Sequence, residues 1–293
     1  MEYTLSAWAK INLSLDVTGL REDGYHTLDT VMHTVSLCDR LTLSLEEEPG
    51  IRLATDRDYL PVDEKNTAYR AAKLFFEAAG RPHQGLTLRI EKHIPSRAGM
   101  GGGSADAAAV LRGLNALFGA PLSGAELEAL GARIGADVPF CVRGGSCRCT
   151  GVGEVLTPAP ALPPCFLVIC KPPVGVSTPR AYALLDRLPP ARTQATPRVL
   201  EALAQGDLRA IGESLGNRFE DALHLIPVRQ ARKAMLAAGA LGARMTGSGS
   251  AVYGLFPRED AARRAMASVK HLGETFLCTP LGEIPPENLQ LLS

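Results

Sequence analysis

Apolar and polar residues alternate between residues 5 and 17, and this period of two predicts a strand. Ile11 and Leu13 point to one face of that strand, while Lys10 and Asn12 point to the other. Lys10 and Asn12 can therefore reach the same ligand. Taken alone, the polar face of a strand is more often simply solvated, so this interpretation depends on features elsewhere in the chain.

The same patterns predict most of the remaining elements. Strands are expected at residues 30–37, 40–45, 86–90, 166–170, 251–256 and 275–279. Helices are expected at residues 66–79, 123–134, 197–204, 207–223, 227–238 and 259–272, and another opens within residues 176–182. Pattern alone therefore predicts a mixed α and β protein with two lobes, and the Pro-rich segment 158–164 is the expected boundary.

Four glycines fall within five residues, at Gly99, Gly101, Gly102 and Gly103. Glycine lets a backbone turn tightly and approach an anion closely. An Ala-rich run follows and favours a helix, with Ser104 or Gly103 as the expected N-cap. The N-terminus of a helix offers unpaired N–H groups and a partial positive charge, so the segment predicts a phosphate site. A flexible surface loop is the alternative, which this density of glycine disfavours.

Two common phosphate loops do not fit this segment. A Walker A loop ends in Gly-Lys-Ser/Thr, and no lysine lies between Lys92 and Lys171. The dinucleotide-binding fingerprint requires a third glycine where this chain has Ser104. The loop therefore belongs to another class of phosphate site.

Composition and charge narrow the classes of function. The 293 residues are 46% hydrophobic and 21% charged, which is typical of a globular protein. Lysine plus arginine and aspartate plus glutamate both number 31, so a net charge of zero gives no basic footprint for nucleic acid. The first residues lack the pattern of a secretory signal, and the apolar run 166–170 is too short to span a bilayer. We therefore expect a cytoplasmic protein that binds neither nucleic acid nor membrane.

The seven cysteines are odd in number and scattered, so they indicate no disulfide framework. Cys141, Cys147 and Cys149 lie close enough in sequence to bind a metal. Their spacing is not that of a zinc ribbon, however, and buried free thiols are the expectation.

Three further segments carry candidate chemistry. The turn at residues 23–24 presents Tyr25 and His26, which can stack on a base and bond its edge, although a structural role is common for such a pair. Asp137 is a lone carboxylate among apolar residues, which suits a catalytic base or a helix cap equally. The loop at residues 246–250 can close over a phosphate or a substrate, but a hairpin loop has the same sequence character.

The pattern Pro-x-x-x-Gly-Met-Gly-Gly-Gly-Ser-Ala at residues 95–105 resembles the phosphate loop of the GHMP kinases, with Met100 where the family usually has leucine. Further motifs of one group of GHMP kinases have counterparts, in order and over nearly the whole chain, at residues 9–13, 21–28, 135–139 and 246–250.

This resemblance implies an α+β fold of two domains, with the active site in the cleft between them. The N-terminal domain would span residues 1–157 and carry the phosphate loop, and the C-terminal domain would span residues 158–293. The implied activity is the transfer of a phosphoryl group from ATP to an alcohol.

The resemblance also implies a catalytic pair. Asp137 would take the proton of the attacking hydroxyl, and Lys10 would keep Asp137 ionised and stabilise charge in the transition state. ATP and Mg²⁺ would be the cofactors, with Ser104 a candidate for the environment of the metal. The nucleotide phosphates would contact backbone N–H groups, proline excepted, of Pro95, Ser96, Arg97, Ala98, Gly99, Met100, Gly101, Gly102, Gly103, Ser104 and Ala105.

The segment 21–28 resembles the substrate loop of those GHMP kinases whose substrate carries a cytidine diphosphate. By that resemblance, Tyr25 and Tyr182 would sandwich the cytosine and His26 would hydrogen-bond it. Tyr182 stands where phenylalanine is more usual. Asn12 and Thr178 would help to seat the substrate.

Three alternatives remain open at this point. A GHMP kinase or decarboxylase that acts on another small alcohol is disfavoured by Tyr25 and His26. A non-catalytic nucleotide sensor is disfavoured by the presence of both Lys10 and Asp137. An RNA-binding module is suggested because part of the N-terminal architecture resembles a ribosomal-protein fold, and it is disfavoured by the zero net charge. We expect a monomer or a weak homodimer.

Overall fold

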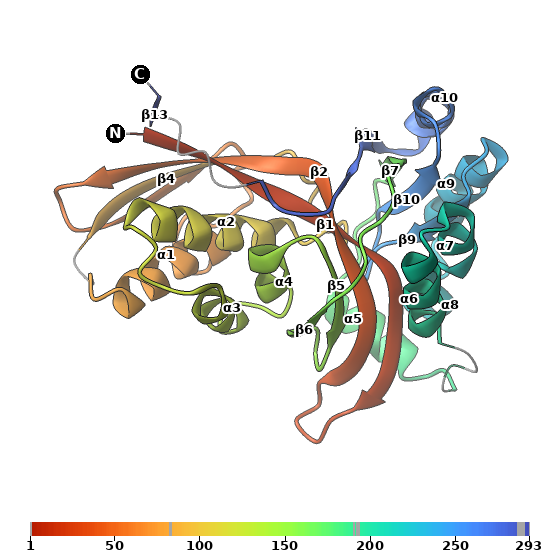
Figure 1. Cartoon of the computed structure of the whole chain (residues 1–293), viewed down its shortest axis with the longest axis horizontal. Helices are drawn as coiled ribbons and strands as arrows, with labels where there is room; N and C mark the ends of the chain where they lie inside the picture. Colours follow the sequence, from red (N-terminus) through yellow and green to blue (C-terminus); the bar gives the residue numbers. More distant parts are fainter. Residues whose placement is uncertain (1, 82–83, 190, 192–193, 286–290, 293) are drawn as a thin grey trace.

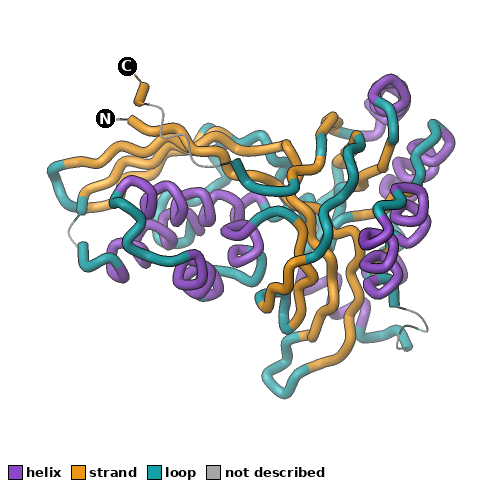
Figure 2. Tube along the Cα trace, viewed as in Figure 1, coloured by secondary structure: helices purple, strands orange, loops and turns teal. Residues whose placement is uncertain are grey.

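Two β-sheets organise the fold, and each carries its own group of helices (Figure 1). The structure is a computed structural model that describes residues 2–81, 84–189, 191, 194–285 and 291–292. The first two strands are long enough to run from the first group of helices into the region beside the second group (Figures 1 and 2). Mixed α and β structure in two lobes agrees with the sequence-based expectation.

The first sheet has the central order β13-β1-β2-β4-β3; of the shorter strands, β5 and β12 pair with β2, β8 pairs with β1, and β6 pairs with β5. Helices α1 to α4 lie along its β1–β2–β4 part (Figure 1). The strands are β1 (Glu2–Leu20), β2 (His26–Glu46), β3 (Gly50–Thr55), β4 (Gly85–Glu91), β5 (Ser146–Thr150), β6 (Val155–Pro158), β8 (Gly216–Asn217), β12 (Pro280–Leu281) and β13 (Leu291–Leu292). The helices are α1 (Thr67–Ala78), α2 (Gly102–Leu117), α3 (Gly124–Ala132) and α4 (Val138–Arg143).

The second sheet has the order β11-β7-β10-β9 and is antiparallel throughout. Its strands are β7 (Phe166–Lys171), β9 (Gly242–Met245), β10 (Val252–Phe256) and β11 (Glu274–Cys278). The helices of this half are α5 (Thr178–Leu185), α6 (Thr196–Gln205), α7 (Leu208–Ser214), α8 (Phe219–Ala222), α9 (Ile226–Ala237), α10 (Glu259–Val269) and the 3₁₀ turn η1 (Lys270–Leu272).

Local sequence signals explain several of these elements. Asn66 caps α1 by accepting the N–H of Ala68, as a residue of this type does at a helix N-terminus. Ser123 and Glu126 form the predicted capping box at the start of α3. The strand predicted at residues 86–90 is β4, and the helices predicted at 197–204 and 227–238 are α6 and α9, each within two residues at either end.

The prediction of separate strands at residues 30–37 and 40–45 was wrong, because β2 is one continuous strand. It pairs with β1 over nearly its whole length, and the register shifts in three places, two of them between Trp8 and Lys10 and between Asn12 and Ser14. Such irregularities bend a strand without ending it. Strands β3, β5 and β6 were not predicted at all.

The prediction of one helix over residues 207–223 was also wrong. Helix α7 ends at Ser214, and strand β8 then pairs with β1 before α8 begins. The cause is Asn217, whose side-chain amide donates to the carbonyls of Met245 and Gly247 and whose oxygen accepts the N–H of Phe219. These bonds hold the chain in a non-helical conformation.

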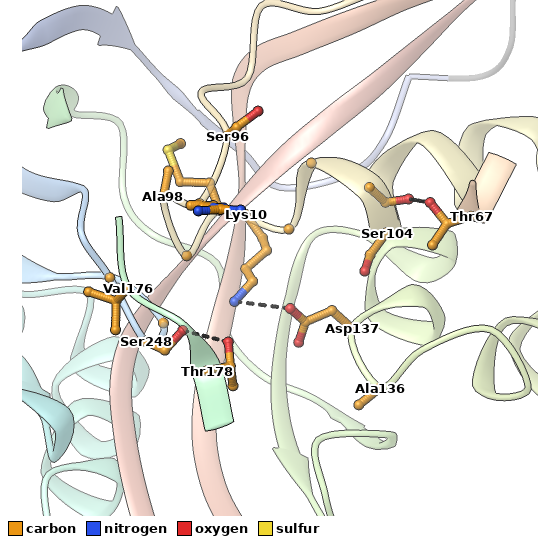
Figure 3. A pocket seen from close by; sticks show the side chains of 18 of the residues that line it. Lys10, Thr67, Ser96, Ala98, Ser104, Ala136, Asp137, Val176, Thr178 and Ser248 are labelled. Atoms are coloured by element: carbon orange, nitrogen blue, oxygen red, sulfur yellow. Dashed lines mark hydrogen bonds and ion pairs between the residues drawn. The ribbon is translucent and has the colours of Figure 1, made fainter. Parts of the chain in front are cut away.

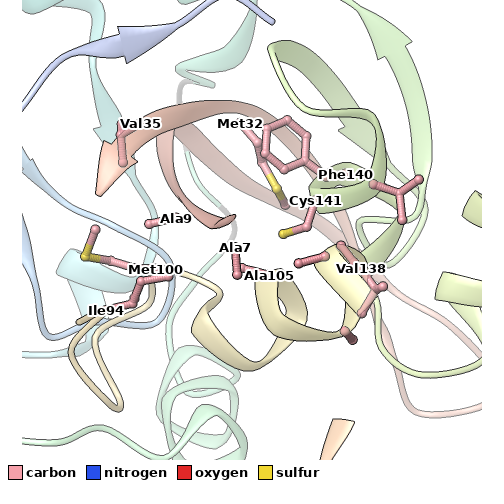
Figure 4. Close-up of a cluster of buried hydrophobic side chains, with 14 of the residues drawn as sticks. Ala7, Ala9, Met32, Val35, Ile94, Met100, Ala105, Val138, Phe140 and Cys141 are labelled. Atoms are coloured by element: carbon pink, nitrogen blue, oxygen red, sulfur yellow. The ribbon is translucent and has the colours of Figure 1, made fainter. Parts of the chain in front are cut away.

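The hydrophobic core reaches the phosphate loop. Ile94, Ala98 and Met100 are buried in the same cluster as the Ala-rich face of α2 and strand β1 (Figure 4). The loop is therefore anchored by apolar side chains although its backbone is rich in glycine. This cluster also contains Leu162 and Leu167, so the core continues past the predicted boundary at residues 157 and 158, which stays a prediction.

All seven cysteines are free, and Cys141, Cys147 and Cys149 are buried as predicted. Burial raises the pKa of Cys141 to about 12, which makes its thiol unreactive. Within the described ranges, no three or more histidine, cysteine, aspartate or glutamate residues are grouped so that they could hold a metal ion. No helix among the described residues is long and apolar enough to cross a membrane.

Candidate active site

A cavity of about 1140 Å³ lies where the two groups of elements meet. Its walls come from β1, the segment between β4 and α2, the start of α4, the start of α5, and the loop between β9 and β10 (Figure 3). Drug-sized ligands occupy pockets of roughly 300–1,000 Å³, so this space suits a large ligand or two smaller ones. Every residue predicted to be catalytic or to bind ATP or the substrate, Ala105 excepted, lines it.

Lys10 and Asp137 face one another in this cavity (Figure 3). The Lys10 Nζ to Asp137 Oδ2 distance is 3.3 Å; the lysine side chain is buried, whereas that of the aspartate is 33% exposed. Asp137 stands at the N-cap position of α4, but its side chain makes no capping hydrogen bond. The carboxylate therefore points to the lysine and the cavity, where it can meet a reacting hydroxyl.

Asn12 orients Lys10 and is itself buried. Its Oδ1 accepts from Lys10 Nζ at 2.8 Å and from the N–H of Gly247 at 3.1 Å, and its Nδ2 donates to Thr30 Oγ1. The shared strand face predicted for Lys10 and Asn12 is confirmed. Because the amide of Asn12 is already bonded within the protein, its direct effect here is on Lys10 and on the loop at 246–250.

The segment at 95–105 forms a cradle at the N-terminus of α2. Gly101 is the N-cap with φ +72°, so the expected cap at Ser104 or Gly103 was wrong and the helix begins at Gly102. The first intrahelical bond runs from the N–H of Ala105 to the carbonyl of Gly101. The N–H groups of Gly102, Gly103 and Ser104 therefore precede the ladder and can bind an anion.

Tertiary contacts decide where α2 begins. The Lys10 N–H donates to the carbonyl of Met100, beside the bulge in β1. A Cβ at Gly101 would lie 3.2 Å from Lys10 Cγ, and one at Gly99 would lie 2.1 Å from the carbonyl oxygen of Thr246. Glycine is required at both positions, since each combines a positive φ with this crowding.

The loop at residues 246–250 closes against the phosphate loop. The Thr246 hydroxyl accepts the N–H of Asn12, and the N–H of Ser250 donates to the carbonyl of Arg97. Thr178 Oγ1 and Ser248 Oγ lie 2.9 Å apart and join the start of α5 to this loop (Figure 3). Both loops and Thr178 therefore surround Lys10 and Asp137.

His26 and Tyr182 form a stacked aromatic pair at another wall of the cavity. Their ring centroids are 4.4 Å apart at 15°, and Phe219 meets Tyr182 edge-on. His26 Nε2 lies 2.6 Å from Asp186 Oδ1, and burial raises the pKa of Tyr182 to about 12. Tyr25 is 64% exposed and lines the same cavity. The predicted sandwich of Tyr25 and Tyr182 around a base stays a prediction.

A buried charge cluster beneath the phosphate loop was not predicted. Lys92 Nζ donates to Asp39 and, at 2.6 Å, to Asp106 Oδ2. Asp39 Oδ1 also accepts the N–H groups of His93 and Ile94, the residues that lead into the loop. Lys92 and Asp106 line the cavity. The signal in the sequence that could have indicated this cluster is Asp106, an aspartate in an otherwise alanine-rich helix turn.

Desolvation by itself raises the pKa of the buried Asp106 and lowers the pKa of the buried Lys92. Desolvation is the largest cause that raises the pKa of Asp106 to about 7, although Lys92 opposes it. The two carboxylates more than offset the desolvation of Lys92, so its pKa is raised. The cluster thus holds a charged lysine beside an aspartate whose pKa lies well above its ordinary value.

Comparisons with known proteins place this site in a family. The protein-family model described as "GHMP kinases N terminal domain" matches residues 66–145, and the family model "GHMP kinases C terminal" matches residues 199–275. A 4-diphosphocytidyl-2-C-methyl-D-erythritol kinase from Brevibacillus brevis is 42% identical over 285 residues, which cover 96% of this chain and 97% of that protein.

Comparison with solved structures leads to the same family. A crystal structure of 4-(cytidine 5'-diphospho)-2C-methyl-D-erythritol kinase is 40% identical with a TM-score of 0.78, over 96% of this chain and 99% of that one. A homoserine kinase from Cytophaga hutchinsonii has a TM-score of 0.80 at 23% identity, over 96% of each chain, so backbone shape alone does not separate these kinases. The identity does separate them: the chain belongs to the GHMP kinase family and, within it, to the 4-diphosphocytidyl-2-C-methyl-D-erythritol kinases.

Proposed function

We propose that this protein phosphorylates the 2-hydroxyl of 4-diphosphocytidyl-2-C-methyl-D-erythritol with ATP, giving the 2-phosphate and ADP, in the non-mevalonate (MEP) pathway of isoprenoid precursor synthesis. The observation that carries the proposal is the Lys10–Asp137 pair, 3.3 Å apart, beside a phosphate cradle in one cavity. The sequence identity to kinases of this substrate supports the choice of acceptor.

Phosphoryl transfer depends mostly on positioning and on the stabilisation of charge. Asp137 accepts the proton of the 2-hydroxyl as that oxygen attacks the terminal phosphorus of ATP. The Lys10 ammonium, held by Asn12, balances the negative charge that develops on the transferred group. The leaving ADP oxygen stays close to the N–H groups at the start of α2.

The cavity offers room for the two nucleotides. The ATP phosphates would lie on the 95–105 loop, and the cytosine would lie against Tyr25 and the His26–Tyr182 pair. In this arrangement Thr178 and Asn12 border the acceptor, and the exposed ring of Tyr25 supplies a stacking face. The family implies ATP, and these individual contacts are proposals that rest on the positions of the residues in the cavity.

Mg²⁺ fits the donors on this side of the cavity. Ser104 and Asp137 offer a hydroxyl and a carboxylate oxygen near the phosphate cradle (Figure 3), and Mg²⁺ prefers oxygen ligands together with substrate phosphates. The absence of a cluster of three acidic or imidazole groups among the described residues suits a metal carried mainly by ATP. When bound, Mg²⁺ would neutralise phosphate charge.

The test is ADP release by the purified protein with Mg-ATP, with and without 4-diphosphocytidyl-2-C-methyl-D-erythritol. We expect turnover that requires the acceptor, together with a phosphorus signal for a new monophosphate ester. Homoserine and mevalonate serve as matched alternative alcohols. Turnover with one of these and none with the cytidine substrate would contradict the proposal. Light scattering after size-exclusion chromatography tests the prediction of a monomer or weak homodimer.

A further inference from the structure

Arg97 is a charged residue on the phosphate loop whose guanidinium has no acidic partner among the described residues. It is exposed and lines the same cavity as Lys10 and Asp137. The proposed function uses the backbone of residues 95–105 and the hydroxyl of Ser104, but not the side chain of Arg97. The role of its side chain is therefore still to be explained.

The two lysines that lie against the loop glycines are already engaged, and Lys65, which also lines the cavity, belongs to the segment before α1. Lys10 contacts Asp137, and Lys92 contacts Asp39 and Asp106. Two nucleotides would bring at least five negative charges into the cavity, two on the acceptor diphosphate and three or more on ATP. Arg97 is the loop's own cation that remains free to meet them.

The surroundings of Arg97 hold it in place. Its carbonyl accepts the N–H of Ser250, and its Cδ lies 3.2 Å from where a Cβ would stand on Gly175. The missing side chain of Gly175 leaves room for the arginine stem. A side chain that is held before the ligand arrives loses less conformational entropy on binding.

The backbone at this position would suit glycine better. Arg97 has φ +50°, a conformation that residues with a Cβ adopt infrequently and that glycine adopts freely. A strained residue beside a binding site is a reason to look for a function of its side chain.

We propose that the Arg97 guanidinium binds phosphate oxygens of a nucleoside di- or triphosphate in this cavity, in addition to the backbone cradle. A guanidinium presents paired N–H donors that match two phosphate oxygens. ATP and the cytidine diphosphate of the acceptor carry the same chemistry, and both reach this cavity under the proposed function, on which this inference rests.

The test is calorimetric titration of the full chain with ATP, adenosine, CDP and cytidine. The variants are Arg97→Ala, Arg97→Lys and the control Arg229→Ala, an exposed arginine that does not line the cavity. A lost hydrogen bond to a charged group weakens binding by about 10- to 150-fold. We expect a loss of this size for ATP or CDP with Arg97→Ala, a smaller loss with Arg97→Lys, and none with Arg229→Ala. Adenosine and cytidine should bind all variants alike.

Each outcome decides the proposal. A loss confined to ATP assigns Arg97 to the phosphate donor, and a loss confined to CDP assigns it to the acceptor. Unchanged binding of both, or an equal loss for the nucleosides, overturns the proposal. If the wild type binds ATP yet phosphorylates no cytidine substrate, the proposed function fails while the ATP titration still decides the role of Arg97. A wild type that binds neither ATP nor CDP overturns both.

Discussion

Two lysine–aspartate clusters lie at one cavity and differ in how far their side chains are exposed to solvent. In the first, Lys10 contacts Asp137, whose carboxylate is one-third exposed. In the second, Lys92 contacts Asp39 and Asp106, and all three side chains are almost fully buried. The same residue types therefore form an accessible pair and a closed cluster around one phosphate loop.

The difference shows that a lysine–aspartate ion pair does not by itself indicate a catalytic role. Asp137 makes no capping bond and keeps part of its surface open, so a substrate hydroxyl can reach it. Asp39 uses its oxygens on Lys92 and on two backbone N–H groups that lead into the loop. The open pair suits catalysis, and the closed cluster holds the loop in shape.

The largest expected effect comes from the open pair. Asp137→Asn keeps the shape of the side chain but removes the proton acceptor, and a positioned base is worth about 10²–10⁴ in rate. We expect kcat to fall by at least about 100-fold with little change in Tm, because the residue is partly exposed. Steady-state ADP release and a thermal melt measure the two quantities. Near-wild-type turnover would rule out the base assignment.

Breaking the closed cluster should act on stability first. Asp39→Ala removes one of the two carboxylates that pair with buried Lys92 and leaves two N–H groups without their acceptor, and breaking a buried ion pair costs about 3–5 kcal/mol. We expect Tm to fall by on the order of 10 °C. Asp260→Ala is the control, since its pairs with Arg258 and Arg264 lie on the surface, where ion pairs contribute little to stability. Equal melting temperatures for the two variants would contradict this account.

The comparison extends to two equally exposed tyrosines on different walls. Tyr25 and Tyr59 are both 64% exposed and both line the cavity. Stacking on a base is worth about 1–3 kcal/mol, so Tyr25→Ala should raise KM for the cytidine substrate by about 5- to 150-fold, with a much smaller change in kcat. Tyr59→Ala should leave that KM near the wild-type value. An unchanged KM in Tyr25→Ala would remove the proposed cytosine contact.

The last prediction concerns pH and separates Asp106 from Asp137. Burial raises the pKa of Asp106 to about 7, whereas the unfolded value is near 4. The folded protein therefore holds a proton that the unfolded chain releases, and this group's contribution to stability falls as pH rises from about 4 to about 7. Asp106→Asn should remove that component. Urea unfolding at pH 5 and pH 8 measures it. If the free energy of unfolding changes by the same amount between these pH values in the variant and the wild type, the assignment is contradicted.

The sequence predicted the features that depend on residues close together in the chain. Strand and helix periods located most elements, and the capping box at Ser123 formed as expected. Lys10, Asp137 and the phosphate loop, which the family motifs assign to one site, line one cavity. These features follow from local patterns or from motifs spread along the whole chain.

Features that depend on distant partners were missed. Lys92 and Asp39 are 53 residues apart, so no local pattern indicates their contact. The break at Asn217 depends on carbonyls 28 and 30 residues away. The N-cap of α2 is fixed at Gly101 by contacts with Lys10, because capping propensity alone does not choose between Gly101, Gly102 and Gly103.

The contact between Gly99 and Thr246 has a consequence for cooperativity. The phosphate loop belongs to the first half of the chain and the 246–250 loop to the second, yet each blocks the other's backbone from moving alone. Nucleotide binding to one loop should therefore slow amide hydrogen exchange in both. The two halves are expected to respond to ligand as one cooperative unit.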